Sequence, residues 1–250
     1  MSARSRDLAP LKRVGHKGAD LVAPGNTLDS FRAALDAGVD MIEFDVLRLH
    51  DGRLVLAHDM GDATKREPIA LEEGLDHFAG EAYAGVELDV DLKLPGYEHE
   101  VVEALAARGL TERALVSSTY LESMDALGRV APGLRRGWSV PRAKRDYTRS
   151  LLAPFAYALL RAVRVWLPWR AAAMIRAGRF EAVMAHWLLV SPRLVERVRA
   201  AGGQTYVWTV DDGRRIERLA ALGVDGVITN DPRLFAPSGA QPDTKQVAAE

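Results

Sequence analysis

The 250-residue chain contains no cysteine, which excludes a disulfide framework, a thiolate metal site and a cysteine nucleophile. Any metal ion must therefore be bound by Asp, Glu, His or backbone oxygen atoms. The formal net charge is only −1, so the charge balance gives no indication of a nucleic-acid partner. The first residues, MSARSRDLAPLKR, are basic but include no apolar core, so we expect that they do not form a signal peptide. A cytoplasmic location is the expectation that follows.

Short apolar runs typical of β-strands alternate with helical patterns along most of the chain. We predict eight strands, at residues 13–16, 41–47, 85–93, 114–118, 134–140, 181–186, 205–210 and 226–229. Most segments between them carry apolar residues at helical spacing, and several end at a glycine. This alternation predicts an α/β fold, a single (β/α)8 TIM barrel. A doubly wound open sheet is the alternative, but no GxGxxG pattern follows the first strand.

The predicted barrel domain spans residues 10–235. We expect a short insertion after its second strand and an elaborated helical segment around residues 143–180. The last residues, 236–250, are polar and contain proline, glycine and serine, so we expect them to form a disordered tail.

Carboxylates occur at the predicted strand ends, where the active site of such a barrel lies. Glu43 and Asp45 are two residues apart on one strand, and this spacing points both side chains inward. Asp91 comes from the next predicted strand, and Asp89 shares its face. Inward carboxylates repel one another and lose solvation unless a cation or a proton joins them. Three carboxylates without cysteine suit a hard divalent cation such as Mg2+ or Ca2+.

Two histidines and a lysine accompany these carboxylates. His16 ends the first predicted strand, and His58 follows the turn that returns from the second; both are candidates for a general acid and base. Lys93 would add positive charge for an anionic substrate, although a salt bridge to Asp91 inside the barrel is the alternative. His186 ends a later strand and is a further candidate for the pocket. Together these groups indicate hydrolysis of a phosphate ester.

Four sequence blocks, HKGA, APGNT, IEFDV and LVLAHD, resemble the signature of the glycerophosphodiester phosphodiesterase family, within the phosphatidylinositol-phosphodiesterase-like barrel superfamily. Members of that family usually read His-Arg-Gly, Pro-Glu-Asn-Thr, Glu-x-Asp-Val and His-Asp there. The resemblance continues in DLK, where the family has Glu-x-Lys. It closes in VWTVDD and GVDGVITNDP, where the family has Trp-Thr-Val and Gly-Val-Asp-Gly-Ile-x-Thr-Asp-x-Pro. The resembling region runs from about Val14 to Pro232.

The resemblance implies a metal-dependent hydrolase that converts glycerophosphodiesters, or lysophospholipids, into glycerol 3-phosphate, or lysophosphatidic acid, and an alcohol. It implies one divalent cation, Mg2+ or Ca2+, bound by Glu43, Asp45 and Asp91. It also implies acid and base catalysis by the two histidines, His16 and His58. The residues that match substrate-binding positions are Lys17, Asn26, Lys93 and Trp208.

Three residues depart from the family pattern. Lys17 stands where the family usually has arginine, and it lacks the bidentate fork that arginine offers to a phosphate. Gly25 replaces a glutamate, and Asp91 is one methylene shorter than the usual glutamate. These departures affect substrate choice more than reaction type. Two alternatives stay open: a phospholipase D-like relative that releases a cyclic phosphate, and a non-catalytic protein that binds phosphodiesters or a lipid surface.

The segment 147–180 is rich in leucine, alanine, tryptophan and arginine. Its uninterrupted apolar runs reach about ten residues, too short to span a bilayer, and we expect Pro154 and Pro168 to break or kink it. One interpretation is a barrel helix with an elaborated loop. The other is an interfacial amphipathic element in peripheral contact with a membrane, where arginines meet anionic headgroups and aromatic rings lie at the acyl boundary. The residues concerned are Arg161, Arg164, Arg170, Arg176, Phe155, Trp166 and Trp169.

Overall fold

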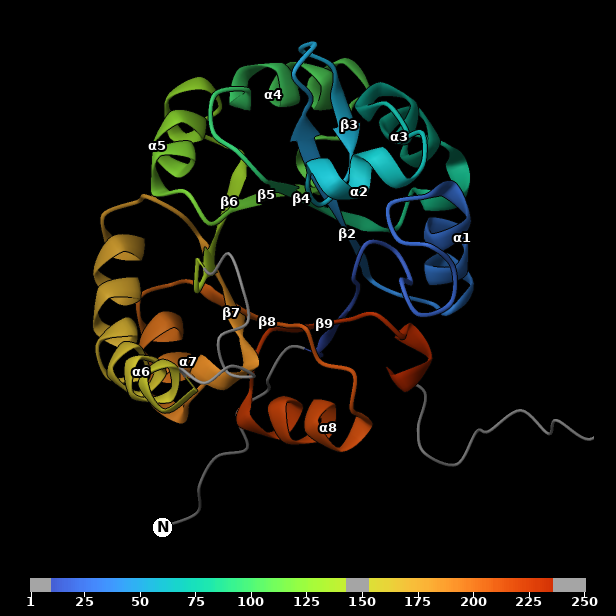
Figure 1. Cartoon of the computed structure of the whole chain (residues 1–250). Helices are drawn as coiled ribbons and strands as arrows, with labels where there is room; N and C mark the ends of the chain where they lie inside the picture. Colours follow the sequence, from blue (N-terminus) through green and yellow to red (C-terminus); the bar gives the residue numbers. More distant parts are fainter. Residues whose placement is uncertain (1–9, 143–152, 236–250) are drawn as a thin grey trace, which may run out of the picture.

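The computed structural model describes residues 10–142 and 153–235. Within these ranges eight parallel strands form a closed barrel that helices surround (Figure 1). The barrel strands are β1 (Lys12–Gly15), β2 (Met41–Arg48), β4 (Glu87–Leu92), β5 (Ala114–Ser118), β6 (Arg135–Val140), β7 (Ala182–His186), β8 (Gln204–Trp208) and β9 (Gly226–Thr229). The barrel closes because β1 pairs with β2 on one side and with β9 on the other. The (β/α)8 prediction is confirmed, and the open-sheet alternative is wrong.

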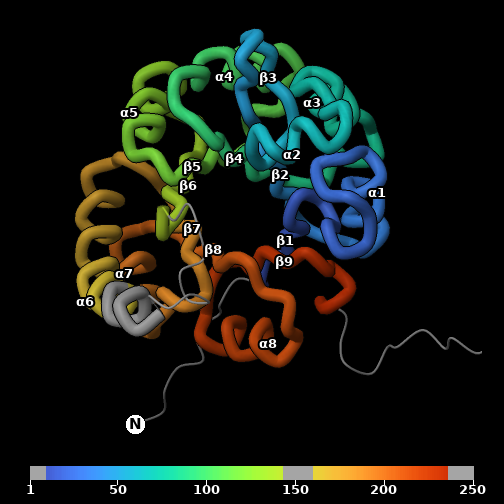
Figure 2. The backbone as a smooth tube through the Cα atoms, in the orientation of Figure 1, coloured from blue at the N-terminus to red at the C-terminus, as the bar shows by residue number. Residues whose placement is uncertain are grey.

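One further strand and the helices lie outside the ring of parallel strands, as the tube in Figure 2 shows. β3 (Leu54–Leu56) pairs antiparallel with the last residues of β2. The α-helices are α1 (Leu28–Asp36), α2 (Met60–Lys65), α3 (Leu71–Phe78), α4 (Glu98–Ala107), α5 (Leu121–Val130), α6 (Ala153–Arg176), α7 (Pro192–Ala200) and α8 (Gly213–Leu222). Short 3-10 helices occur at η1 (Glu81–Tyr83), η2 (Thr111–Arg113), η4 (Trp187–Leu189) and η5 (Pro232–Phe235).

Strand β2 shows how the sequence separates the two faces of the barrel wall. Ile42 and Phe44 belong to the large apolar core between the strands and the outer helices. Met41 belongs to a second apolar cluster, which fills the barrel interior together with residues such as Tyr206. Because side chains alternate between faces along a strand, Glu43 shares the inner face with Met41. The barrel is therefore packed below its polar end.

The predicted insertion after the second strand consists of β3, α2 and α3. The hairpin between β2 and β3 turns at Asp51 and Gly52, and His58 follows between β3 and α2. Asp59 begins α2 by accepting a hydrogen bond from the Asp62 amide. The predicted tail, 236–250, lies outside the described residues.

Helix α6 lies in the segment for which the sequence leaves two interpretations open. It runs as one helix of 24 residues through Pro168, so this proline does not break the segment, and a kink there stays a prediction. Burial of the neighbouring Leu167 and Ala171 against the barrel outweighs the backbone hydrogen bond lost at Pro168. Residues 143–152 and the side chain of Phe155 lie outside the described part. No helix among the described residues is both long and apolar enough to cross a membrane.

Candidate active site

The loop after β1 folds tightly against the start of α1. Gly18 has φ +85°, and a Cβ atom there would lie 2.6 Å from the backbone of Ser30, so a larger residue would clash. The Ser30 hydroxyl donates a hydrogen bond to the Lys17 carbonyl oxygen at 2.7 Å. Thr27 caps the helix in a capping box with Ser30. These local contacts hold His16 and Lys17 at the carboxyl end of β1.

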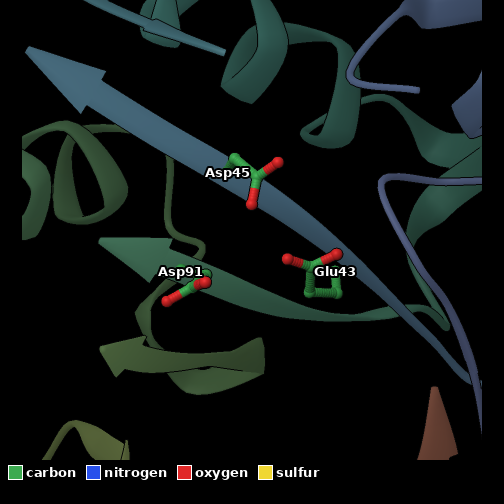
Figure 3. Close-up of side chains that lie close together, drawn as sticks. All are labelled: Glu43, Asp45 and Asp91. Atoms are coloured by element: carbon green, nitrogen blue, oxygen red, sulfur yellow. The ribbon is translucent and has the colours of Figure 1, made fainter. Parts of the chain in front are cut away.

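Three carboxylates from β2 and β4 lie together inside the barrel (Figure 3). In the strand register, Asp45 lies beside Asp91 and Glu43 lies beside Asp89. One oxygen atom each of Glu43, Asp45 and Asp91 lies within 4.8 Å of the other two. The Asp91 Oδ1 atom is buried and has no hydrogen-bond partner. Such an all-oxygen, converging donor set fits a hard divalent cation.

Among the described residues, Lys93 is the lysine that forms ion pairs with these carboxylates. Its Nζ atom lies 2.5 Å from Asp91 Oδ2 and also forms an ion pair with Asp45. Burial opposes the charge on Lys93, but Asp45 and Asp91 raise the pKa of Lys93 well above its usual value. Burial likewise opposes the charge on Asp45, whose pKa is nevertheless lowered, with Lys93 the strongest favourable partner.

The other carboxylates are less well compensated. Burial and then the Asp45 charge raise the pKa of Glu43 well above its usual value. Burial and the Asp91 charge raise the pKa of Asp89 to about 7. Burial also raises the pKa of Asp91, despite the lysine. This excess of negative charge favours binding of a cation or a proton.

Asn26 and Lys17 hold the carboxylates in place. The Asn26 side chain donates to Asp45 Oδ2 at 2.8 Å, and its Oδ1 accepts from the Asp45 amide at 3.1 Å. The Lys17 amide donates to Glu43 Oε2 at 2.8 Å, while its ammonium group lies 3.3 Å from Asp20. Neither residue lines the cavity described below. Their substrate-binding roles therefore stay predictions.

The glycine at position 25 has a local explanation. Its amide donates to Asp20 Oδ1 at 2.8 Å. A Cβ atom on Gly25 would lie 2.5 Å from that oxygen and 2.8 Å from Lys17 Cβ. The glutamate typical of the resembling family has no room here while Asp20 pairs with Lys17. The glycine therefore allows the close approach of Asp20 to the backbone at this position.

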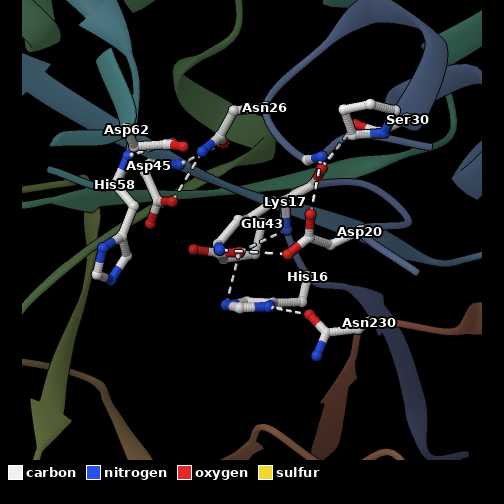
Figure 4. A network of polar contacts seen from close by, with 12 residues as sticks. His16, Lys17, Asp20, Asn26, Ser30, Glu43, Asp45, His58, Asp62 and Asn230 are labelled. Carbon is white, nitrogen blue, oxygen red and sulfur yellow. Dashed lines mark hydrogen bonds and ion pairs between the residues drawn. The ribbon is translucent and has the colours of Figure 1, made fainter. Parts of the chain in front are cut away.

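The two candidate catalytic histidines occupy different environments (Figure 4). The His16 ring lies with Nδ1 2.5 Å from Asn230 Oδ1 and Nε2 3.8 Å from Glu43 Oε2. Burial and then the Lys17 charge lower the pKa of His16 to about 4. The His58 side chain is 53% exposed, and its Nδ1 lies 3.1 Å from Asp59 Oδ2. One ring is therefore enclosed beside a neutral amide, and the other faces solvent beside a carboxylate.

A cavity of about 380 Å³ opens among these groups. The predicted site residues that line it are His16, Glu43, His58, Asp91, Lys93 and Trp208. The Trp208 ring is fixed by a hydrogen bond from Nε1 to the Met184 carbonyl oxygen at 2.8 Å. His186 does not line the cavity; its ring packs edge-on against Trp208, with 5.2 Å between ring centroids.

Sequence reasoning missed several residues of this site. Tyr120 and Arg142 line the cavity, and the Arg142 guanidinium lies 4.0 Å from the centre of the Tyr120 ring. They follow strands in segments without a recognisable motif, so no signal indicated them. A motif did indicate position 230, because the closing motif of the resembling family has aspartate where this chain has Asn230. Asp211, which bonds to Asn230, lies in the VWTVDD block.

Comparison with known proteins agrees with this geometry. The model of the Glycerophosphoryl diester phosphodiesterase family matches residues 16–73 and 95–234 of the chain. The glycerophosphodiester phosphodiesterase of Caldanaerobacter subterraneus subsp. tengcongensis is 29% identical over 253 residues, which cover 88% of this chain and 93% of that protein.

Solved structures share the fold. The glycerophosphodiester phosphodiesterase of Agrobacterium tumefaciens has a TM-score of 0.65 and 21% identity, covering 90% of this chain and 98% of that one. An Oleispira antarctica phosphodiesterase, solved in complex with the product sn-glycerol-3-phosphate, has a TM-score of 0.65 and 20% identity. The match covers 90% of this chain and 94% of that chain.

Proposed function

The chain belongs to the glycerophosphoryl diester phosphodiesterase family and is a phosphoric diester hydrolase, and we propose that it converts glycerophosphodiesters into glycerol 3-phosphate and an alcohol. We extend the proposal to lysophospholipids, which would yield lysophosphatidic acid. The observation that carries it is the joint lining of one cavity by carboxylates, a lysine and two histidines. The product bound to the Oleispira antarctica relative supports the substrate class.

A divalent cation is part of this proposal. Glu43, Asp45 and Asp91 would hold it, because their oxygen atoms converge and Asp91 Oδ1 lacks a partner. When bound, Mg2+ or Ca2+ would neutralise charge on the phosphoryl oxygens. Lys93, which lies among the same carboxylates, would add a second positive charge beside the phosphate.

The reaction itself needs a proton acceptor and a proton donor on opposite sides of the phosphorus atom. One histidine of the pair His16 and His58 takes the proton of the nucleophile, which is water or the neighbouring hydroxyl of the substrate. The other gives a proton to the leaving alcohol. Trp208 supplies an apolar wall for the glycerol or the alcohol. Attack by the substrate hydroxyl would first give a cyclic phosphate.

The test is an assay of purified protein with glycerophosphocholine and lysophosphatidylcholine, after EDTA treatment and after reloading with Mg2+ or Ca2+. We expect turnover that requires the metal and falls about 10³-fold in His16→Ala. Asp45→Asn should lose both turnover and metal binding by calorimetry. Asp76→Asn is the control, because Asp76 is an exposed carboxylate that pairs with Arg108.

The products separate the proposal from its alternatives. Phosphorus NMR should show glycerol 3-phosphate or lysophosphatidic acid. A cyclic phosphate as the final product would favour the phospholipase D-like alternative. Retained phosphodiester binding without turnover of either substrate would favour the non-catalytic alternative.

We also propose that α6 contacts the surface of an anionic membrane, on the cytoplasmic side. Val165, Trp166 and Trp169 are exposed to 64%, 43% and 56% close together on this helix, and grouped exposed apolar side chains are typical of an interaction surface. The exposed arginines near them are Arg161, Arg164, Arg170 and Arg176. Helix α6 contains no acidic residue, so this charge is complementary to anionic headgroups.

Vesicle co-sedimentation tests this contact. Wild-type protein should sediment with vesicles of equal phosphatidylglycerol and phosphatidylcholine, and less with phosphatidylcholine alone. The triple variant Arg161→Glu, Arg164→Glu, Arg170→Glu should lose binding. Arg129→Glu, an exposed arginine on α5, should keep it. No difference between the triple variant and wild type would sink the proposal.

A further inference from the structure

A chain of hydrogen bonds runs from the loop after β8 to the ring of His16. Asp211 Oδ2 accepts from the Asn230 side-chain amide at 2.7 Å. Asp211 Oδ1 accepts from the Asn230 backbone amide at 2.8 Å and from the Thr229 hydroxyl at 3.0 Å. Asn230 Oδ1 in turn lies 2.5 Å from His16 Nδ1. Four residues from three elements that are distant in sequence thus form one network.

The network leaves one orientation for the Asn230 amide. A carboxylate only accepts hydrogen bonds, so the group that faces Asp211 must be the amide NH2. The amide oxygen of Asn230 then faces His16, and a carbonyl oxygen also only accepts. The ring nitrogen Nδ1 must therefore carry a proton. In the neutral ring, this leaves a lone pair on Nε2, the nitrogen nearer Glu43.

We propose that Asn230, oriented by Asp211, is the positioning residue that fixes the tautomer and the ring plane of His16, and thereby makes Nε2 a proton acceptor. In the resembling family, the position of Asn230 is an aspartate, which would put a negative charge directly against the ring. In this chain the negative charge lies on Asp211, which contacts Asn230 rather than the His16 ring. A neutral amide transmits its orienting effect instead.

An aspartate at position 230 would be incompatible with Asp211. Two carboxylates would then face each other across a 2.7 Å contact, where both cannot stay ionised without strong repulsion. Exchanging the two residues, with asparagine at position 211 and aspartate at position 230, would restore every hydrogen bond of the network. The side-chain oxygen of the introduced asparagine would accept from the backbone and from Thr229, and its NH2 group would donate to the introduced aspartate. The pair is therefore interchangeable only as a unit.

This inference deepens the proposed function and rests on it. In the chemical step, the O–H bond of the nucleophile breaks and its proton bonds to His16 Nε2. The nucleophile oxygen bonds to phosphorus, and the bond from phosphorus to the leaving oxygen breaks. His58, whose Nδ1 faces the Asp59 carboxylate, then supplies the proton that the leaving alcohol takes up.

The first test reads the tautomer directly in the folded, metal-loaded protein. Two-bond proton–nitrogen NMR spectra of 15N-histidine-labelled protein distinguish protonated from bare ring nitrogens, and His16→Gln assigns the signals. We expect a proton on Nδ1 and a bare Nε2 in the wild type. Asn230→Ala should give a mixture of tautomers. A proton on Nε2 in the wild type, or an unchanged spectrum in Asn230→Ala, would overturn the proposal.

The second test uses rescue by exchange. Asn230→Asp alone should lower kcat about 10²-fold with little change in KM. The double variant Asp211→Asn, Asn230→Asp should recover kcat to within about tenfold of wild type and restore the single tautomer. Asp231→Asn is the matched control, because this neighbouring carboxylate pairs with Arg233 rather than with the site. A double variant no better than Asn230→Asp would overturn the proposal.

The two proposals fail in different ways. If the wild type turns over no phosphodiester, the proposed function fails, and the NMR result still stands or falls by itself. If the wild type is active but the NMR signals of His16 do not change in the variants at positions 230 and 211, only the positioning role fails.

Discussion

The two ends of the barrel differ in how fully their carboxylates are paired with cations. At the amino end, carboxylates pair with cations of the chain: Glu87 pairs with both Lys12 and Arg135, and Asp40 pairs with Arg13. At the carboxyl end, Glu43, Asp45, Asp89 and Asp91 lie around Lys93, which forms ion pairs with two of them. The strands are the same, and the charge balance differs.

This difference separates stability from function within one barrel. At the amino end, ion pairing compensates the charged residues at the starts of the strands, so these residues change the free energy of unfolding little. Unmatched carboxylates at the carboxyl end raise the pKa of Glu43 and Asp89 and leave a buried oxygen of Asp91 without a partner. Buried carboxylates that lack full compensation lower the stability of the fold. The imbalance therefore indicates a ligand that completes it.

The largest expected effect comes from removing Lys93 at the carboxyl end of the barrel. Lys93→Met should lower kcat by about 10²–10³-fold, because a positive charge beside the phosphate is lost. It should also destabilise the metal-free protein by about 3–5 kcal/mol, because Asp45 and Asp91 lose their cation. Kinetics and chemical unfolding in EDTA measure the two effects.

Lys12→Met is the matched control at the amino end. Glu87 keeps Arg135 at 2.6 Å there, so the free energy of unfolding should change by less than about 1 kcal/mol. Its kcat should stay at the wild-type value. Equal losses of activity in the two variants would contradict the division between the two ends.

The second prediction concerns the pH dependence of stability. The pKa of Asp89 is raised to about 7 by burial and by Asp91, so its protonated form is favoured in the folded state. This stabilisation is present at low pH and is lost as the pH rises from about 4 to about 7. Asp89→Asn removes the cost of ionising a buried carboxylate beside Asp91, so the variant should be more stable than wild type at pH 8 by up to about 4 kcal/mol. Thermal unfolding in EDTA between pH 4 and pH 8 measures it.

Asp40→Asn should show the opposite sign. Burial raises the pKa of Asp40, but the hydrogen bonds from Arg13 outweigh burial and lower this pKa below its usual value. The stabilisation by ionised Asp40 is therefore present at neutral pH and is lost as the pH falls through the lowered pKa. The variant should therefore be less stable than wild type at pH 7 and approach it in acid. Parallel pH profiles for the two variants would refute the contrast.

The smallest effect is expected on α6, where the unmatched charge is positive and faces outward. The double variant Trp166→Ala, Trp169→Ala should raise KM about tenfold for lysophospholipid presented in anionic vesicles, because apolar contact with the bilayer is lost. Its KM for soluble glycerophosphocholine should not change. Val130→Ala, an exposed apolar residue on α5, is the control. Equal changes with both substrates would place the effect in the active site instead.

Most strand positions could be predicted, and the misses are instructive. The strands 114–118 and 226–229 have the predicted bounds. The predicted strand 205–210 ends earlier, at Trp208, although Val210 is fully buried. An apolar residue reports burial, and burial does not require strand pairing. Pro168 does not interrupt α6, because a local rule about proline leaves out the packing that holds the rest of the helix.

The candidate site was predictable where charged residues are spaced two apart along a strand, so that they share one face. Glu43 and Asp45 are two residues apart, so alternation alone puts them on one face, and Asp91 and Lys93 repeat the pattern. Arg142 and Tyr120 follow strands in irregular segments, where no period applies. His16 and His58 were predicted as a pair of catalytic residues, but their different neighbours in the structure could not be anticipated.

Sequence alone determined the barrel, the family resemblance and the inward carboxylates, because strand alternation and motif spacing are local properties. Tertiary structure decided which cation meets which carboxylate, and what holds His16. Asn230 lies 214 residues from His16 in the chain, and the two meet because β9 closes the barrel against β1. No local pattern encodes that contact, since it exists only once every intervening strand has taken its place in the ring.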